Sequence, residues 1–309
     1  MRLLVPAIAA LLFASPALGA PKVIASVVPV HGIVSAVMGE FGQPELLLQG
    51  SMPEHRASFT TRQIIALGKA DIVFIIGHGL EAKLAQLSGS EAVNGKTFIE
   101  LSEAPGVATL PIREGGAWEA HADEAEEAGH EDHEDGVLSF DPHVWLDPGN
   151  AKAMATLVAA ELAKSDPENA MTYAANAMAF AALVDATANA IDAELMALRD
   201  RPYIVFHDAY HYFEKRFGLA AVGSISDVSA RAPSAQRLEE IRRKLTAAKA
   251  VCVFREPQYD GKLVAAVIEG TPAREGVLDP LGAALTPGPQ AYQQLLKTLA
   301  ASLKACLAG

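Results

Sequence analysis

The stretch SDPENAMTYAANAMAFAALVDATANAIDAELMAL, residues 165–198, decides the fold. It opens with Ser165-Asp166-Pro167-Glu168, where a capping side chain, a proline and an acid stand in the order typical of a helix start. Apolar side chains recur at helical spacing from Phe180 to Leu198, and neither Gly nor Pro occurs before Pro202. We therefore predict one helix over 167–198, roughly 48 Å long at 1.5 Å per residue. Such a helix is stiff enough to join two lobes.

Short apolar runs alternate with helical patterns on both sides of this segment. The runs are Val23–Val28, Leu46–Leu48, Ile72–Ile76 and Thr97–Ile99 before it, and Tyr203–Phe206, Val251–Phe254 and Gly276–Leu278 after it. This alternation is typical of parallel sheets buried on both faces. We predict an α/β protein with two lobes, each a mostly parallel sheet flanked by helices. The lobes are residues 20–165 and 201–309, and the rigid linking helix lies within 166–200.

Negative charge is concentrated in one segment of the chain. The formal net charge is −12, and residues 114–135 contain ten carboxylates and no Lys or Arg, which accounts for −10. Residues 112–137 also lack apolar periodicity, so we expect a disordered loop that interrupts the first lobe. An acidic chain whose remainder is nearly balanced argues against nucleic acid as a partner.

The N-terminus has the features of a secretory signal. Arg2 precedes an apolar run, Leu3–Ala14, that is short for a bilayer span, and Ala17-Leu18-Gly19 offers small residues for cleavage. We interpret residues 1–19 as a signal peptide cut after about Gly19, with a membrane anchor as the alternative. No later segment has about 18 uninterrupted apolar residues, so we expect a periplasmic chain without direct membrane insertion.

The chain contains two cysteines, Cys252 and Cys306. In an oxidising compartment two cysteines most simply form one disulfide. It would close a loop of about 55 residues, which chain-entropy arguments value at roughly 4 kcal/mol. Two buried free thiols are the alternative.

Three of the nine histidines stand in distinctive contexts. His55 follows the run ending near Leu48, His207 immediately follows Tyr203–Phe206, and His143 lies where apolar sequence resumes after the acidic segment. Ligands of open α/β sheets bind beyond the carboxyl ends of the strands. Imidazole is the commonest side-chain metal ligand, and three imidazoles favour zinc over manganese or calcium. Isolated loop or core histidines are the alternative on spacing alone.

Other histidines have weaker signals. His207 and His211 are spaced i, i+4, which would put both on one helix face and can chelate zinc. No Glu follows His207 to act as a base, so we favour His207 as a ligand and His211 as a neighbour at the site mouth. His78 and His31 are interpreted as residues that shape the surroundings.

Four motifs occur in an order that resembles one protein family. They are Pro53-Glu54-His55, Phe140-Asp141-Pro142-His143-Val144-Trp145-Leu146-Asp147-Pro148, Val205-Phe206-His207-Asp208-Ala209-Tyr210 and Leu278-Asp279-Pro280-Leu281-Gly282. The chain is similar over nearly its whole mature length to the metal-binding proteins of bacterial zinc and manganese ABC importers, the zinc group above all. The similarity includes the acidic insertion and the two cysteine positions.

The resemblance implies a function and a set of ligands. The protein would capture Zn²⁺ as cargo between two α/β lobes and deliver it to a membrane permease, as a monomer and without enzymatic activity. His55, His143 and His207 match the ligand positions, and a histidine at 207 is the zinc-type pattern. Glu54 or water is favoured as the fourth ligand because zinc is content with four, and Asp279 is the competing candidate.

Two departures and three alternatives accompany this interpretation. The insertion has only three histidines, His121, His130 and His133, so we expect at most a weak secondary metal site there, with a solvated spacer as the alternative. His211 replaces a small residue, and we expect at most a transient ligand role for it at the cleft mouth. The alternative functions are a secreted zinc hydrolase with a three-histidine site, a manganese importer component, and a general metal buffer or surface adhesin.

Overall fold

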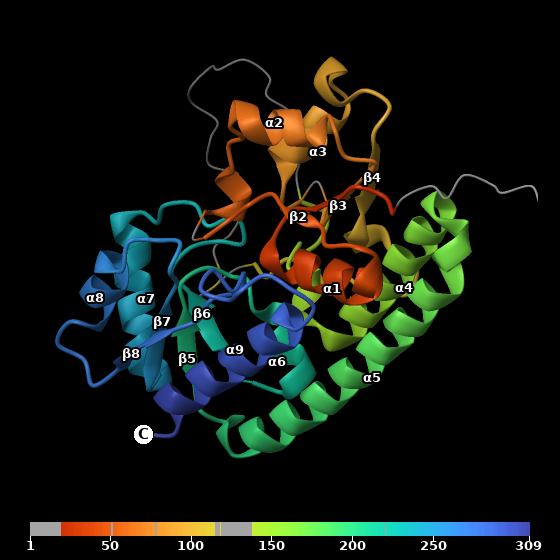
Figure 1. The fold of residues 1–309 in the computed structure, drawn as a ribbon. Helices are drawn as coiled ribbons and strands as arrows, with labels where there is room; N and C mark the ends of the chain where they lie inside the picture. Colours follow the sequence, from red (N-terminus) through yellow and green to blue (C-terminus); the bar gives the residue numbers. More distant parts are fainter. Residues whose placement is uncertain (1–19, 51, 78, 115–117, 119–137, 220) are drawn as a thin grey trace, which may run out of the picture.

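The computed structural model describes residues 20–50, 52–77, 79–114, 118, 138–219 and 221–309 (Figure 1). The proposed signal peptide, His78 and the three histidines of the insertion lie outside these residues. Nothing in the structure therefore tests the predictions made for them.

Two parallel sheets form the centres of two lobes. The first contains β1 (Val23–Ala25), β2 (Glu45–Leu46), β3 (Ile72–Ile75) and β4 (Thr97–Glu100), in the order β2-β1-β3-β4. The second contains β5 (Tyr203–Val205), β6 (Ala221–Ser224), β7 (Cys252–Arg255) and β8 (Arg274–Val277), in the order β6-β5-β7-β8. All neighbouring strands are parallel. The predicted two-lobed α/β fold is confirmed.

Buried strands lie at the centre of each sheet. Ile24 of β1 pairs with Val73 of β3, and Tyr203 of β5 pairs with Cys252 of β7. Every residue of β1, β3 and β5 is buried, because helices cover both faces of a parallel sheet.

The helices are α1 (Val28–Met38), α2 (Thr61–Leu67), α3 (Ala82–Ser88), α4 (Pro148–Ser165), α5 (Ala170–Leu195), α6 (His211–Phe217), α7 (Ala235–Ala248), α8 (Lys262–Ile268) and α9 (Ala291–Leu307). Helices α7 and α8 pack on the second sheet, whereas α1, α4, α5 and α9 pack on one another along one side of the molecule (Figure 1). Two 3₁₀ turns, Glu54–Arg56 and Val144–Leu146, lie at the candidate site.

The helix predicted over 167–198 is present. It consists of α5 with a 3₁₀ turn at each end, Pro167–Asn169 and Met196–Leu198. The start signal works through side chains: Asp166 accepts hydrogen bonds from Asn169 Nδ2 at 2.8 Å and from the Tyr173 hydroxyl at 2.7 Å. These bonds hold the turn that leads from α4 into α5.

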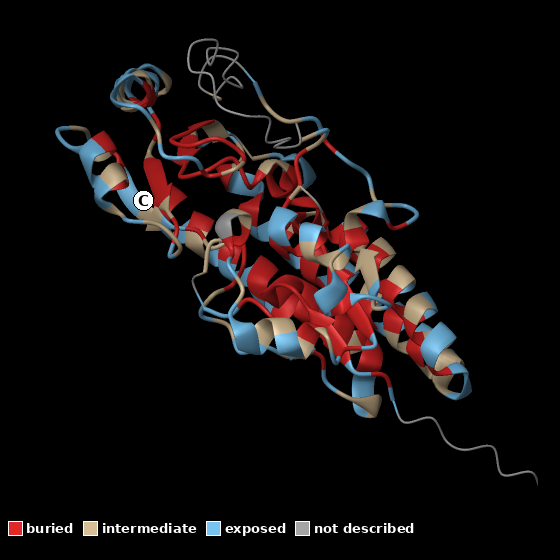
Figure 2. Cartoon of the chain, turned by 90° about the horizontal axis from the view of Figure 1, so that it is seen from above, coloured by how far each residue is buried: buried red, intermediate tan, exposed pale blue. Residues whose placement is uncertain are grey.

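This helix is also the one in the described part of the chain that is long and apolar enough to cross a membrane, by length and composition. Its buried side chains, such as Phe180 and Val184, belong to the core shared with α4 and α9. Met171 and Met178, on its other face, are exposed. Figure 2 shows buried and exposed residues along the helices in red and pale blue. One side of the helix is thus used for packing within the protein.

Three local details differ from the sequence-based expectation. The run Val23–Val28 is not one strand, because Pro29 suits the first turn of a helix and α1 begins at Val28. Strand β6 was not predicted, since Ala221-Val222-Gly223-Ser224 is short and contains small residues. Helix α4 was not predicted either, and it packs side by side with α5. The linking helix α5 is therefore packed against a second helix.

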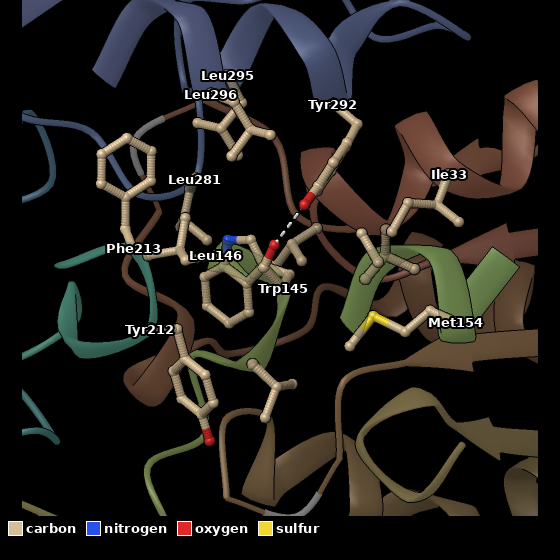
Figure 3. Packing of buried hydrophobic residues seen from close by; sticks show 14 of the residues in the cluster. Ile33, Trp145, Leu146, Met154, Tyr212, Phe213, Leu281, Tyr292, Leu295 and Leu296 are labelled. Atoms are coloured by element: carbon tan, nitrogen blue, oxygen red, sulfur yellow. Dashed lines mark hydrogen bonds between the residues drawn. The ribbon is translucent and has the colours of Figure 1, made fainter. Parts of the chain in front are cut away.

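One continuous hydrophobic core joins the two lobes. Side chains from β1, α4, α5, β5 and α9 belong to the same buried cluster. At its centre the Tyr292 hydroxyl donates to the Trp145 carbonyl at 2.8 Å (Figure 3). The Trp145 indole in turn donates to the carbonyl of Pro280 at 2.9 Å. The lobes are thus packed on one another as well as linked.

Candidate metal centre

Glu54, His55, His143 and His207 come together between the two sheets. Glu54 and His55 lie in the 3₁₀ turn after β2, His143 immediately precedes the turn Val144–Leu146, and His207 follows β5. One potential ligand atom from each lies within 4.8 Å of every other. Among the described residues this is the one such group of three or more His, Cys, Asp or Glu side chains. The structure therefore brings the three predicted histidines and Glu54 to one place.

The spacing of these atoms suits a small cation. His143 Nε2 lies 3.2 Å from His207 Nε2, and Glu54 Oε1 lies 3.8 Å from Nε2 of both His55 and His207. Ligand atoms of a tetrahedral zinc with bonds of about 2.0 Å are about 3.3 Å apart. The four side chains are thus already close to the positions that one zinc ion requires.

A carboxylate holds the imidazole of His143. Asp141 Oδ1 accepts hydrogen bonds from His143 Nδ1 at 2.7 Å and from its backbone N–H at 3.0 Å. Burial lowers the pKa of His143 well below its usual value, which favours the neutral ring. With the Nδ1 proton directed at Asp141, the Nε2 lone pair is directed at the centre of the group.

Glu256 holds His207 in the same way. His207 Nδ1 lies 2.8 and 2.7 Å from the two Glu256 oxygens, and the Tyr210 hydroxyl donates to Glu256 at 3.1 Å. Burial opposes a charged ring, but the Glu256 carboxylate outweighs it and raises the pKa of His207 to about 9. A proton on His207 Nε2 then bridges to His143 Nε2, in the position that a metal ion would take.

Glu54 is a buried carboxylate whose oxygens have no hydrogen-bond partner among the described residues. The residue is 1% exposed. Burial raises the pKa of Glu54 to about 7. A buried acceptor without a partner is costly, and a cation bound to it would remove that cost.

Asp279, the competing fourth ligand, is engaged elsewhere. Its Oδ1 accepts from Gln258 Nε2 at 2.8 Å and from the backbone N–H groups of Leu281 and Gly282. Its Oδ2 accepts from the Ala283 N–H at 2.6 Å. Asp279 thus caps a turn, and this geometry favours Glu54 over Asp279 as the carboxylate of the group.

The prediction that His207 and His211 share a helix face is wrong. β5 ends at Val205 and α6 begins at His211, so that His207 lies in the connecting loop. The chain turns there because His207 is held by Glu256 of the neighbouring strand end. His211 Nδ1 instead lies 3.9 Å from Asp141 Oδ2, beside the group and outside it.

His31 has a packing role. Its ring bonds the Pro44 carbonyl at 3.0 Å and the Ser35 hydroxyl at 3.2 Å, on the buried side of α1. Both ring nitrogens are therefore occupied by neighbours within the first lobe.

The base of the acidic segment is more ordered than expected. Arg113 donates to Asp208 at 2.9 Å and to Glu214 at 2.5 Å, and both carboxylates are buried. The guanidinium also lies over the Trp118 ring, 3.5 Å from its centroid. The expectation of a disordered loop over residues 112–137 is thus wrong for Arg113, because two buried acids of the second lobe need a cation.

Sequence reasoning assigned no role to Asp141 or Glu256. Asp141 stands two residues before His143, which is a short reach to its Nδ1. Glu256 follows the strand β7, next to β5, so the sheet-end rule that selected His207 also selects it. Both signals were present in the printed sequence.

Comparison of the sequence with known proteins identifies one family. Residues 23–306 match the family described as "ZnuA: Zinc-uptake complex component A periplasmic". The High-affinity zinc uptake system protein ZnuA of Brucella abortus (strain 2308) is 42% identical over 305 residues, covering 92% of this chain and 91% of the relative.

Solved structures agree with the sequence match. A crystal structure of ZnuA superposes with a TM-score of 0.76 at 27% identity, covering 93% of this chain and 99% of that one. A ZnuA deletion mutant with zinc bound gives a TM-score of 0.74 at 26% identity, covering 93% and 98%. The chain therefore belongs to the ZnuA family, whose members are periplasmic binding components of zinc uptake systems and not enzymes.

Proposed function

We propose that this protein binds one Zn²⁺ through His55, His143, His207 and Glu54 in the periplasm and delivers it to the membrane permease of an ABC-type zinc importer. The observation that carries the proposal is the buried group of three imidazoles and one carboxylate within 4.8 Å of one another. Zinc is the cargo of the protein and takes part in no reaction there.

Two features of the group favour zinc over manganese. Three imidazole nitrogens suit zinc, whereas manganese prefers oxygen ligands. The 3.2 Å separation of the facing Nε2 atoms also fits short bonds in a tetrahedron. The names of the relatives and the zinc-bound ZnuA deletion mutant support the same choice.

The arrangement argues against a zinc hydrolase. Catalytic zinc usually keeps three protein ligands and an open position for water. Here four protein side chains converge, and three of them, Glu54, His143 and His207, are at most 1% exposed. Four protein ligands with this little exposure suit capture and transport of the ion.

We infer further properties from the sequence and from the family resemblance. Residues 1–19 act as a secretory signal removed after about Gly19, and the mature chain works as a monomer without membrane insertion. Residues 20–165 and 201–309 are the two lobes on either side of the linking segment 166–200. His121, His130 and His133, among the carboxylates of the insertion, collect zinc weakly.

Calorimetric titration of the metal-free protein tests the proposal. We expect one tight zinc per chain, at least about 100-fold weaker in His143→Ala and in His207→Ala because each removes a ligand from a four-ligand site. Glu54→Gln should weaken zinc binding more than Asp279→Asn does. His211→Ala is the matched control, since this histidine lies beside the group without belonging to it, and its equilibrium affinity should not change.

Two outcomes would contradict the proposal. Unchanged zinc affinity in His143→Ala would remove the assigned site. Tighter binding of Mn²⁺ than of Zn²⁺ in a competition titration would move the protein to manganese uptake.

A further inference from the structure

We propose that Asp141 and His211 form a second, weaker site for a divalent cation, through which zinc passes on its way to the four-residue group. The proposal rests on the zinc function argued above. It concerns how the ion arrives and leaves, and the four ligands that hold it at equilibrium are unchanged.

Two buried polar atoms without hydrogen-bond partners face each other at this place. Asp141 is 1% exposed, and its Oδ2 accepts no hydrogen bond among the described residues, since only Oδ1 serves His143. His211 Nδ1 is likewise buried without a hydrogen-bond partner there, 3.9 Å from Oδ2. This separation is too long for a hydrogen bond, yet it suits two ligands of one cation.

Burial favours the neutral form of His211. It lowers the pKa of His211 to about 4, and Nδ1 has no hydrogen-bond partner among the described residues. In the tautomer with the proton on Nε2, Nδ1 presents a lone pair to a carboxylate oxygen. Two acceptors directed at each other require a cation or a water molecule between them.

Neighbouring hydrogen bonds hold the two side chains in place. The Tyr212 hydroxyl donates to the Asp141 carbonyl at 2.7 Å and accepts from the Leu110 N–H at 2.9 Å. The Asp141 N–H donates to the Leu110 carbonyl at 2.9 Å. The start of α6, Asp141 and the base of the acidic segment are thereby fixed to one another.

The position suits an intermediate on the path of the ion. The His211 side chain is 20% exposed, whereas the His143 and His207 side chains are fully buried. Asp141 touches both His211 and His143, so an ion at Oδ2 is separated from the four-residue group by a single carboxylate. An ion that moves from solvent to the buried ligands on this side therefore meets Asp141 and His211 first.

The surrounding charge also favours a cation. Arg113 and Lys215 are positive groups near His211, and Arg113 forms ion pairs with two carboxylates, Asp208 and Glu214. With Asp141 added, three acids face these two bases. The local field is thus negative despite the guanidinium, and it draws a divalent ion toward Asp141.

Stopped-flow kinetics test the proposal. Trp145, whose ring centroid is 5.3 Å from that of His143, provides a fluorescence signal for zinc arrival, and an excess of chelator gives the dissociation rate. In the full mature chain His211→Ala should slow association and dissociation by the same factor, about threefold or more, with an unchanged Kd. An intermediate on the path changes both rates equally and leaves their ratio alone.

Controls separate the proposal from its alternatives. Lys215→Ala, on the same helix, should not slow either rate. Unchanged rates in His211→Ala would contradict a second site on the path of the ion. A change in Kd caused by the dissociation rate alone would contradict it as well. Failure of the wild-type protein to bind zinc would instead refute the function proposed above.

A direct observation is also available. Crystals of the zinc-loaded protein soaked in Co²⁺ should show anomalous scattering between Asp141 Oδ2 and His211 Nδ1. The peak should be missing in His211→Gln. Ordered water at this position, with no anomalous signal at millimolar Co²⁺, would overturn the proposal.

Discussion

The buried imidazoles of His143 and His207 are each backed by a carboxylate on Nδ1. Glu256→Gln keeps a hydrogen-bond acceptor for His207 but removes the negative charge that makes its Nε2 basic. We expect zinc affinity to fall about tenfold or more, within the range found for residues that orient metal-binding histidines. Competition with a chromophoric chelator measures the change. Tyr210→Phe, which removes only a hydroxyl bonded to Glu256, should cost less. Equal affinities of Glu256→Gln and the wild type would contradict this role.

The protons of the metal-free group predict how zinc affinity depends on pH. Glu256 outweighs the effect of burial and raises the pKa of His207 to about 9, and burial raises that of Glu54 to about 7. Zinc needs both groups deprotonated, so binding releases protons and weakens as the pH falls.

The expected slope changes across the two pKa values. Between pH 8 and 7 only His207 is fully protonated, and the zinc affinity should fall about tenfold per pH unit; below about pH 7 Glu54 also competes and the slope should approach about 100-fold. Calorimetry in buffers of different ionisation enthalpy counts the released protons. An affinity that stays flat from pH 8 to 6 would show that the metal-free group is already deprotonated.

At the scale of residues, the sequence identified the metal-facing histidines better than the carboxylates that hydrogen-bond to them. His55, His143 and His207 were recognisable because imidazole is rare and chemically distinctive. Asp141 and Glu256 are two acids among 37, and only their position relative to a histidine or a strand end marks them. Whether Glu54 or Asp279 joins the histidines depended on which carboxylate the backbone N–H groups already satisfy, and this is a property of the folded turn.

The Cys252–Cys306 disulfide joins β7 to α9. Replacing both cysteines by serine should lower the free energy of unfolding by about 4 kcal/mol, because the disulfide closes a loop of 54 residues in the unfolded chain. Urea unfolding of the variant and of the reduced wild type should give the same loss. Zinc affinity should remain, since Cys252 begins β7 and Glu256 lies beyond its other end. A loss of zinc binding in the folded variant would contradict this separation.

The acidic segment should be separable from the tight site. Deleting residues 115–136 removes most of the ten carboxylates and all three insertion histidines, yet it retains Arg113 and its bonds to Asp208 and Glu214. We expect calorimetry to show the tight zinc unchanged and a weaker second phase lost. A variant that lacks only His121, His130 and His133 distinguishes imidazole ligation from general attraction by the acids. Loss of the tight phase in either variant would contradict the division.

At the scale of elements, strong periodic signals predicted well and contextual ones did not. The helix around Phe180 was predictable because a long run without Gly or Pro, with apolar residues at helical spacing, is compatible with few other structures. Strand β6 was not, since the pairing of Val205 with Ser224 stabilises a sequence whose small residues favour no strand by themselves. The loop at His207 was likewise missed, because local spacing permitted a helix and a long-range bond to Glu256 prevented it.

The whole molecule should change shape little when zinc binds. Hinged binding proteins close around their ligand when few contacts join the domains. Here one buried cluster includes residues of both sheets, and Trp145 bonds both Tyr292 and Pro280. Opening the lobes would expose apolar surface and leave buried polar groups without partners.

Small-angle X-ray scattering of metal-free and zinc-loaded protein measures this directly. The radius of gyration should agree within the error of the measurement, whereas a hinge closure of the lobes would reduce it. Tyr292→Phe, which removes one buried hydrogen bond, should lower the free energy of unfolding by about 1 kcal/mol without changing zinc affinity. A zinc-induced contraction larger than this, or a Tyr292→Phe variant with altered zinc affinity, would show that movement between the lobes takes part in capture. With the lobes fixed, we expect release to the permease to come from local rearrangement around the four ligands.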